Sequence, residues 1–271
     1  MKNGLRRYFT LLLFCLVASL PLITLAQESK ASFQDLFQSG VKLYQEKKFP
    51  EAKEVFHKAL EFEKNNVQAL TNLGLTYFQL GEKGWAIALL RRANNLDPDF
   101  STPMSALKFI LPQLDVKEIP HEINSWETLR AKFIQPFSVF SFVLLSAILL
   151  FASGWTWIRF LSLRRRAEEE EKPFPNFPFV GLIYSASFLL LFSLMWAKFY
   201  DLSLVRGTLV AMKAPVLSLP DEKAPILFEL SAGLEVIVLK KEGEWTQVQY
   251  PGGMSGWTKN DGLFITQGDI E

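Results

Sequence analysis

Few side chains in this sequence could carry out acid–base or nucleophilic chemistry, because its 271 residues include only two histidines and one cysteine. His57 stands beside Lys58 in a helical pattern where a surface histidine is expected, and His121 follows a proline. A serine or cysteine nucleophile needs an adjacent base, and residues 207–271 contain neither histidine nor cysteine. The sequence also has no phosphate-binding glycine loop and no metal-ligand spacing. We therefore predict a protein without enzymatic activity, cofactor or metal.

The single cysteine, Cys15, lies in an apolar stretch near the N-terminus, so intramolecular disulfides and cysteine-based zinc sites are excluded. Positive residues precede this stretch, and small residues followed by polar sequence come after it, as in a secretory signal peptide. Lipid attachment at Cys15 is the weaker alternative, since the bulky Phe14 precedes it. We predict a signal peptide at residues 1–26. Whether the signal peptide is cleaved or kept as an anchor, residue 27 is expected on the side of the membrane away from the cytoplasm.

Two further apolar stretches, residues 137–161 and 177–199, are long enough to cross a hydrocarbon core of about 30 Å. Residues 137–157 and 177–197 contain no charged side chain. One such stretch could be a buried core helix, but two of this length favour membrane spans. Pumps and transporters usually keep ionisable groups inside their helices. We therefore predict two transmembrane helices that act as anchors.

The loop between these spans, residues 162–176, indicates their orientation. Positive residues in short loops stay in the cytoplasm, and neighbouring glutamates count little in this rule. We therefore predict that the loop is cytoplasmic, and that residues 27–136 and 198–271 face the periplasm from the inner (cytoplasmic) membrane. The signal peptide predicts the same side for residues 27–136. The positive residues in or beside the loop are Arg159, Arg164, Arg165, Arg166 and Lys172.

Residues 31–100 contain an internal repeat, in which small and large residues recur 34 positions apart. The small pairs are Gly40 and Gly74, Ala52 and Ala86, and Ala59 and Ala93. The large pairs are Leu36 and Leu70, Leu43 and Tyr77, and Phe56 and Leu90. This period resembles that of tetratricopeptide repeats, in which small residues allow two helices of a hairpin to cross closely. A generic pair of helical hairpins is the alternative.

We predict repeats at residues 33–66 and 67–100 and a capping helix at 101–112, within a domain covering residues 27–112. About three repeats are normally needed for a stable stack. The isolated domain is therefore expected to fold poorly or to self-associate. Residues 113–136 are predicted to be a connector with a short helix that leads into the membrane.

The resemblance to tetratricopeptide repeats implies an inner face that binds extended or helical peptides. In this sequence that face is mainly apolar and aromatic, and it lacks the lysines and asparagines that clamp a peptide carboxylate in some relatives. An apolar peptide or partner helix is therefore the expected ligand. The positions predicted to form this face are Phe37, Val41, Tyr44, Thr71, Leu75 and Phe78.

The C-terminal region, residues 207–271, changes to short alternating runs separated by glycine, proline and aspartate. Residues 235–239 and 245–250 predict a hairpin whose turn lies at 242–244. Residues 207–266 resemble a bacterial SH3-type domain, which implies a small barrel that binds cell-wall peptides or proteins, or acts as a spacer. Tryptophans in this family more often pack in the core than bind ligand. The matching residues are Gly233, Trp245, Val248, Gly253, Gly256 and Trp257.

The predicted fold class is thus a multi-domain membrane protein, with all-α tetratricopeptide repeat hairpins, two transmembrane helices and a small all-β SH3-like barrel. This domain order resembles BatE-like members of the Bacteroides aerotolerance (Bat) proteins. The resemblance implies a complex with other Bat proteins, some carrying von Willebrand A domains, and with a MoxR-type ATPase, and a role in tolerating oxidative stress.

The residues themselves predict a scaffold or adaptor, held in the lipid bilayer, that binds periplasmic or membrane proteins through its repeats. The alternative is a cell-wall-associated envelope protein whose SH3-like domain binds peptidoglycan. The formal net charge of +1 offers no basic face for nucleic acid, so no nucleic-acid partner is expected.

Overall fold

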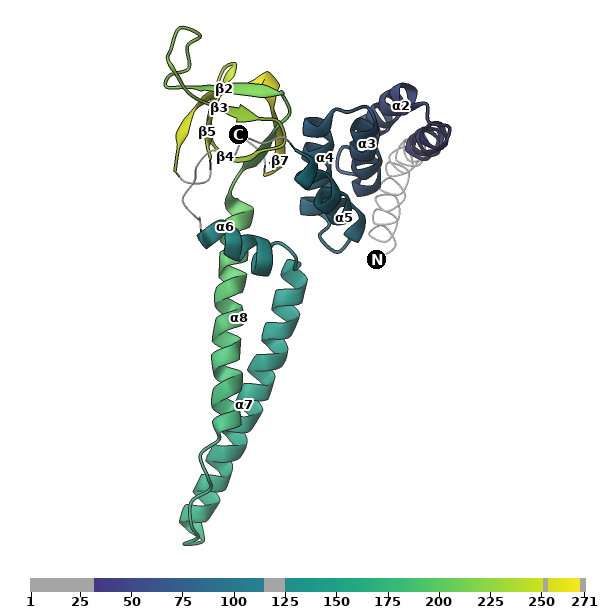
Figure 1. The fold of residues 1–271 in the computed structure, drawn as a ribbon. Coiled ribbons are helices and arrows are strands. Elements are labelled where there is room, and N and C mark those ends of the chain that lie inside the picture. The colour runs from purple at the N-terminus through teal and green to yellow at the C-terminus, as the bar shows by residue number, and fades with distance from the viewer. Residues whose placement is uncertain (1–31, 115–124, 251–252, 269–271) are drawn as a thin grey trace, which may run out of the picture. The chain divides into compact units, whose positions relative to one another are not determined.

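The computed structural model describes residues 32–114, 125–250 and 253–268 (Figure 1). The chain divides into two compact units. The first comprises Met1–Leu96 and Thr102–Leu114, and the second comprises Asp97–Ser101 and Asp115–Glu271. The predicted signal peptide lies outside the described residues.

The first unit consists of consecutive helices joined by short turns, and α3 packs against both α2 and α4. Asn66 begins α3, because its side-chain oxygen accepts a hydrogen bond of 3.0 Å from the backbone N–H of Ala69. The helices are residues 32–45, α2 (Phe49–Phe62), α3 (Val67–Gln79), α4 (Lys83–Leu96) and α5 (Ser101–Ile110), followed by a 3₁₀ turn, η1 (Leu111–Gln113).

Gly40 and Gly74 lie where two helices cross closely. A Cβ atom on Gly40 would be 2.7 Å from Cε1 of Phe56. One on Gly74 would be 3.0 Å from Cγ of Leu90, the residue that matches Phe56 in the 34-residue spacing. The matched alanines at these crossings are fully buried. The repeated small residues therefore have the physical role that their spacing predicted, which is to let a large partner fill the crossing.

The turns within the two hairpins also match. Lys47 has a φ of 61° and Gly81, 34 positions later, has a φ of 82°. Both residues are in the left-handed region, which glycine adopts without steric cost. The first hairpin therefore makes the same turn as the second with a residue less suited to it.

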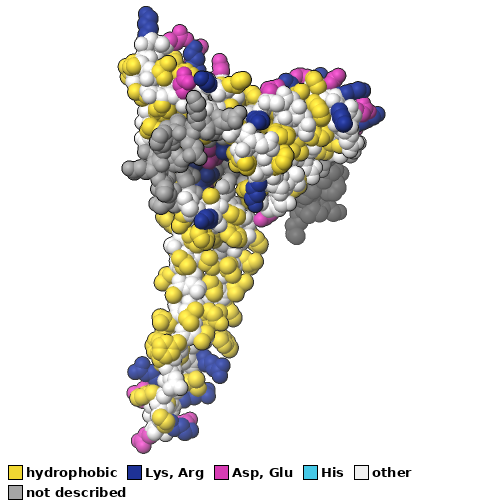
Figure 2. Space-filling model, in the orientation of Figure 1, with side chains coloured by type: hydrophobic (Ala, Val, Ile, Leu, Met, Phe, Trp, Pro, Cys, Tyr) yellow, Lys and Arg dark blue, Asp and Glu magenta, His cyan; other side chains and the backbone are white. Residues whose placement is uncertain are grey.

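The second unit begins with α6 (Ser125–Leu129) and a π-helical turn, η2 (Arg130–Ile134), which leads into the helix pair α7 (Val139–Glu169) and α8 (Phe179–Ser203). Figure 1 shows α7 and α8 side by side along their length, and they are in contact. Both helices are long and apolar enough to span a membrane. Hydrophobic side chains cover them, with charged side chains at one end (Figure 2).

The helix α7 extends further than the predicted span. It continues through Arg164, Arg165 and Arg166 to Glu169, so these arginines lie on its last turns and not in a loop. Arginine, alanine and glutamate are good helix formers, and the first proline after them is Pro173. Nothing in the sequence therefore stops the helix where its apolar part ends.

The C-terminal part of the second unit is one antiparallel sheet in the order β3-β2-β6-β5-β4-β1-β7. The sheet packs around a cluster of buried apolar residues that includes Leu209, Val216, Leu230, Val236 and Val248. Its strands are β1 (Arg206–Leu209), β2 (Lys213–Leu217), β3 (Ile226–Ser231), β4 (Glu235–Glu242), β5 (Trp245–Gln249), β6 (Ser255–Lys259) and β7 (Leu263–Gln267).

The hairpin β4–β5 forms as predicted, with Glu242 opposite Trp245 and Gly243 in the turn at a φ of 57°. The all-β character of this region is confirmed, but the predicted small barrel is not closed, since β3 and β7 are the two ends of the strand order. Within the sheet, β2 and β6 are joined by a single aligned pair, Leu217 with Trp257. Among the described residues β3 and β7 are not paired with each other, so the sheet stays open at these two edges.

Candidate functional site

The six residues predicted to form the repeat face lie on the first helix of each hairpin. Phe37, Val41 and Tyr44 are half-buried on the helix at residues 32–45. Phe37 packs against Phe33 and Phe56, with ring centroids 5.8 Å and 6.0 Å away. Much of the Phe37 ring therefore stabilises the first hairpin, and only its remaining surface is available to a ligand.

On α3, Leu75 and Phe78 are half-buried, whereas Thr71 is only 2% exposed. The hydroxyl of Thr71 donates a 2.6 Å hydrogen bond to the backbone oxygen of Val67, one turn earlier. Thr71 therefore has no side-chain surface to offer a ligand in this structure. The ligand-accessible part of the predicted face on α3 is apolar.

Phe109, which was not among the predicted positions of the repeat face, extends the apolar surface of α3. Its ring centroid is 5.9 Å from that of Phe78 in an edge-to-face arrangement, and its side chain is 65% exposed. Leu111, just beyond α5, is also exposed. The signal in the sequence was an aromatic residue, Phe109, within the predicted capping helix. The prediction treated residues 101–112 only as a cap and not as part of a binding surface.

His57 joins the two hairpins and is half-buried, not at the surface as expected. Its Nε2 atom lies 2.8 Å from the hydroxyl of Tyr77, and burial lowers the pKa of His57 below its usual 6.5. Burial also raises the pKa of Tyr77 to about 12. Tyr77 in turn stacks on Trp85, at 5.7 Å between ring centroids. The histidine therefore has a clear packing role between α2 and α3.

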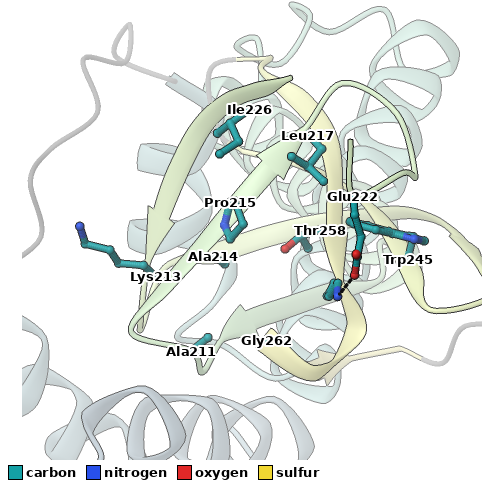
Figure 3. A pocket seen from close by; sticks show the side chains of 11 residues that line it. Ala211, Lys213, Ala214, Pro215, Leu217, Glu222, Ile226, Trp245, Thr258 and Gly262 are labelled. Atoms are coloured by element: carbon teal, nitrogen blue, oxygen red, sulfur yellow. Dashed lines mark hydrogen bonds and ion pairs between the residues drawn. The ribbon is translucent and has the colours of Figure 1, made fainter. Parts of the chain in front are cut away.

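The sheet carries a pocket of about 390 Å³ that residues of β2, β5 and β6 help to line (Figure 3). Its wall is mainly apolar, with Pro215, Leu217, Ile226 and Trp245 among the lining residues. Trp257, by contrast, is buried, so the two tryptophans have different environments. The pocket is thus a small apolar cavity with one indole in its wall.

A charged pair lies beside the indole of this pocket. The Lys259 ammonium contacts the Glu222 carboxylate at 2.5 Å and lies 5.8 Å from the Trp245 ring centroid. The hydrogen bond that the Lys259 ammonium donates to the Glu222 carboxylate raises the pKa of Lys259. Among the described residues, no group of three or more His, Cys, Asp or Glu side chains is placed to hold a metal ion.

A buried ion-pair cluster, which the sequence did not predict, connects the helix pair to the sheet. Arg130 of η2 contacts Asp201 of α8 at 2.8 Å and Glu235 of β4 at 2.9 Å. Arg206 of β1 contacts the same carboxylates, at 2.9 Å and 3.7 Å. The two arginines and Asp201 are at most 4% exposed. Two cations and two anions therefore compensate one another within the junction between α6–η2, α8 and the sheet.

Comparison with known proteins identifies the helical region. Residues 40–81 match the family model for the TPR repeat. Together with the matching hairpins, this shows that residues 40–110 contain tetratricopeptide repeats, a class of module that binds other proteins. No curated protein matches the chain, and no solved structure matches it.

Proposed function

We propose that this protein is a membrane-anchored scaffold that binds a protein segment through its tetratricopeptide repeats. The contact between Phe78 and Phe109 carries the proposal, because Phe109 remains largely exposed although it packs against the repeat face. Aromatic side chains that are exposed in the free protein are common anchors in binding sites. The neighbouring Leu75 adds to an apolar surface that suits an apolar peptide or a partner helix.

Photocrosslinking in intact cells tests this proposal. A photoreactive amino acid placed at Tyr44, Phe78 or Phe109 should form adducts with one or a few proteins. Phe62 is the matched control, since it is an exposed phenylalanine at the end of α2, the second helix of its hairpin. Equal labelling from Phe62, or adducts with lipid or wall fragments alone, would contradict the proposal.

The orientation in the membrane is part of the same proposal. The arginines at the end of α7 support a cytoplasmic loop, and the repeats and the sheet would then both face the periplasm. Thiol labelling of intact spheroplasts tests it in a chain carrying Cys15→Ser. A cysteine at Glu169 should be protected from an impermeant reagent, and one at Lys213 should react. The opposite pattern would reverse the topology.

The domain order supports a finer proposal, that the scaffold works as a BatE-like member of a Bat complex under oxidative stress. Its partners would then be other Bat proteins and, indirectly, a MoxR-type ATPase. Affinity purification of the full chain from membranes should recover proteins with von Willebrand A domains. Phe109→Ser should reduce that recovery, because it removes the exposed ring beside the repeat face. Unchanged recovery would separate the repeats from this assembly.

A second candidate function, binding of peptidoglycan by an SH3-like domain, is favoured by the pocket around Trp245. Gly256 adds to the resemblance, since a Cβ there would be 2.6 Å from Cγ1 of Val216, so β6 can approach β2 only with glycine. The full chain in detergent should then sediment with purified sacculi, and Trp245→Ala should abolish sedimentation. Sedimentation that is unaffected by Trp245→Ala would rule out this pocket.

A further inference from the structure

The helical segment before the first span, formed by α6 and η2, has an exposed apolar stripe. Leu129 and Phe133 are 36% and 52% exposed, and Phe137, just beyond the segment, is 49% exposed. Leu129 and Phe133 are four residues apart, which places them on one side of the helical segment, and Phe137 follows in the bend after η2 ends at Ile134. Thr128 and Lys132 are exposed polar residues one position earlier, so the segment is amphipathic.

Another side of this segment is already packed against protein. Arg130 is buried in its ion pairs with Asp201 and Glu235, and Ile134 is fully buried. The backbone oxygen of Ile134 accepts a 3.1 Å hydrogen bond from Nζ of Lys198 on α8. The segment is therefore fixed on the second unit by these contacts, and its apolar stripe is left uncovered by the described parts of that unit.

Aromatic side chains surround this end of the helix pair. Trp126 of α6 makes an edge-to-face contact with Tyr200 of α8, with ring centroids 5.7 Å apart. Trp196, Phe199 and Tyr200 are all exposed near the end of α8. Tryptophan and tyrosine are enriched where a membrane span meets the headgroup layer. The segment that carries the stripe thus packs against the end of α8, where exposed aromatic residues gather.

We propose that the stripe of Leu129, Phe133 and Phe137 lies in the boundary between lipid headgroups and acyl chains, so that residues 125–137 form an interfacial membrane anchor. The occupant of this surface is the bilayer itself, and the inference rests on the proposed insertion of α7 and α8. Amphipathic helices of this kind bury their apolar side about 5–10 Å into the boundary. Because Arg130 ties the segment to the sheet, the anchor sets the height of the sheet above the membrane.

Spin labelling of the full-length protein in liposomes tests this inference. Single cysteines at Phe133, Lys132 and Leu150, each in a Cys15→Ser chain, would carry the label. Oxygen partitions into lipid and a nickel chelate remains in water, so their relaxation effects report depth. The label at 133 should be protected from nickel at a shallow depth of about 5–10 Å. The label at 132 should be accessible to nickel, and the label at 150 should lie deepest.

The three positions separate the possible failures. If 150 is deep while 133 is as accessible to nickel as 132, the spans insert and the interfacial anchor is wrong. If 133 is shielded from both oxygen and nickel, protein covers the stripe, which also overturns the inference. If 150 itself is accessible to nickel, the proposed membrane insertion fails, and the anchor fails with it. Phe133→Leu keeps an apolar side chain and should leave the depths at 132 and 150 unchanged.

Discussion

Arg130 and Asp201 are 71 residues apart in the chain, yet Nε of the guanidinium lies 2.8 Å from Oδ1 of the carboxylate, and both side chains are buried. Ion pairs in this position are costly to break, because removal of one partner leaves the other charge away from water. The pair also connects the segment before the first apolar helix to the end of the second. It therefore holds both helices and the sheet in one arrangement.

Replacement of Arg130 by alanine should destabilise the second unit by about 3–5 kcal/mol, because Asp201 and Glu235 lose a buried cation. Chemical unfolding of the full chain in detergent would measure the change. Lys213→Ala is the control, since its pair with Glu229 is exposed and 3.7 Å long, and exposed pairs contribute less than about 1 kcal/mol. Similar losses in both variants would show that the buried cluster does not hold the junction.

Replacement of Gly40 by alanine should destabilise the repeat unit by about 1–3 kcal/mol, because the new methyl group would overlap the ring of Phe56. Thermal unfolding of the repeat unit in the full chain would measure this. The double variant Gly40→Ala with Phe56→Leu should recover part of the loss, since the two sites are in contact. Gly154→Ala is the control, because no atom lies within 4 Å of the added Cβ. Purely additive effects of the two changes would contradict a direct clash.

Acidification should destabilise the repeats through His57. Its pKa is lowered by burial, so below about pH 6.5 the unfolded chain takes up a proton that the folded imidazole resists. The contribution is complete above pH 6.5 and is lost as the pH falls toward the lowered value. The unfolding temperature of the repeats should drop over this range. In His57→Gln, which keeps a polar group near Tyr77, this component should disappear; an unchanged slope would assign it to other groups.

A high pH should weaken the contact between His57 and Tyr77 through ionisation of the Tyr77 phenol. The pKa of Tyr77 is raised to about 12, so the folded protein favours the neutral phenol. The stabilisation is present below pH 10 and is lost as the pH rises from 10 toward 12. Absorbance of the phenolate at increasing pH should show one tyrosine that titrates late. Tyr77→Phe should remove that late step, and retention of the step would identify a different tyrosine.

The local features of the repeats could be predicted from the sequence because they depend on residues at fixed spacing. Gly40 and Gly74 mark the helix crossings, and the structure shows Phe56 and Leu90 in the space they leave. The two long apolar helices could also be predicted from the sequence, since the length of an apolar stretch and its lack of charge are local properties. The hairpin at Glu242–Trp245 followed from its turn chemistry.

Features that depend on distant contacts could not be predicted in the same way. The pairing of Arg130 with Asp201 and Glu235 links three segments, and nothing in the sequence indicates which lone charges will meet. The burial of Thr71 depends on how neighbouring helices pack around it. Closure of the sheet also depends on long-range pairing, and no local signal in the sequence shows that β3 and β7 remain its two edges.

The length of α7 has a geometric consequence in a bilayer. From Val139 to Arg159 the helix rises about 30 Å, which equals the thickness of the hydrocarbon core of a bilayer. The ten residues from Phe160 to Glu169 then extend about 15 Å further as continuous helix. With α7 inserted as proposed, Arg164, Arg165 and Arg166 would lie on a rigid helical extension in water, and the rise of the helix would set their distance from the lipid.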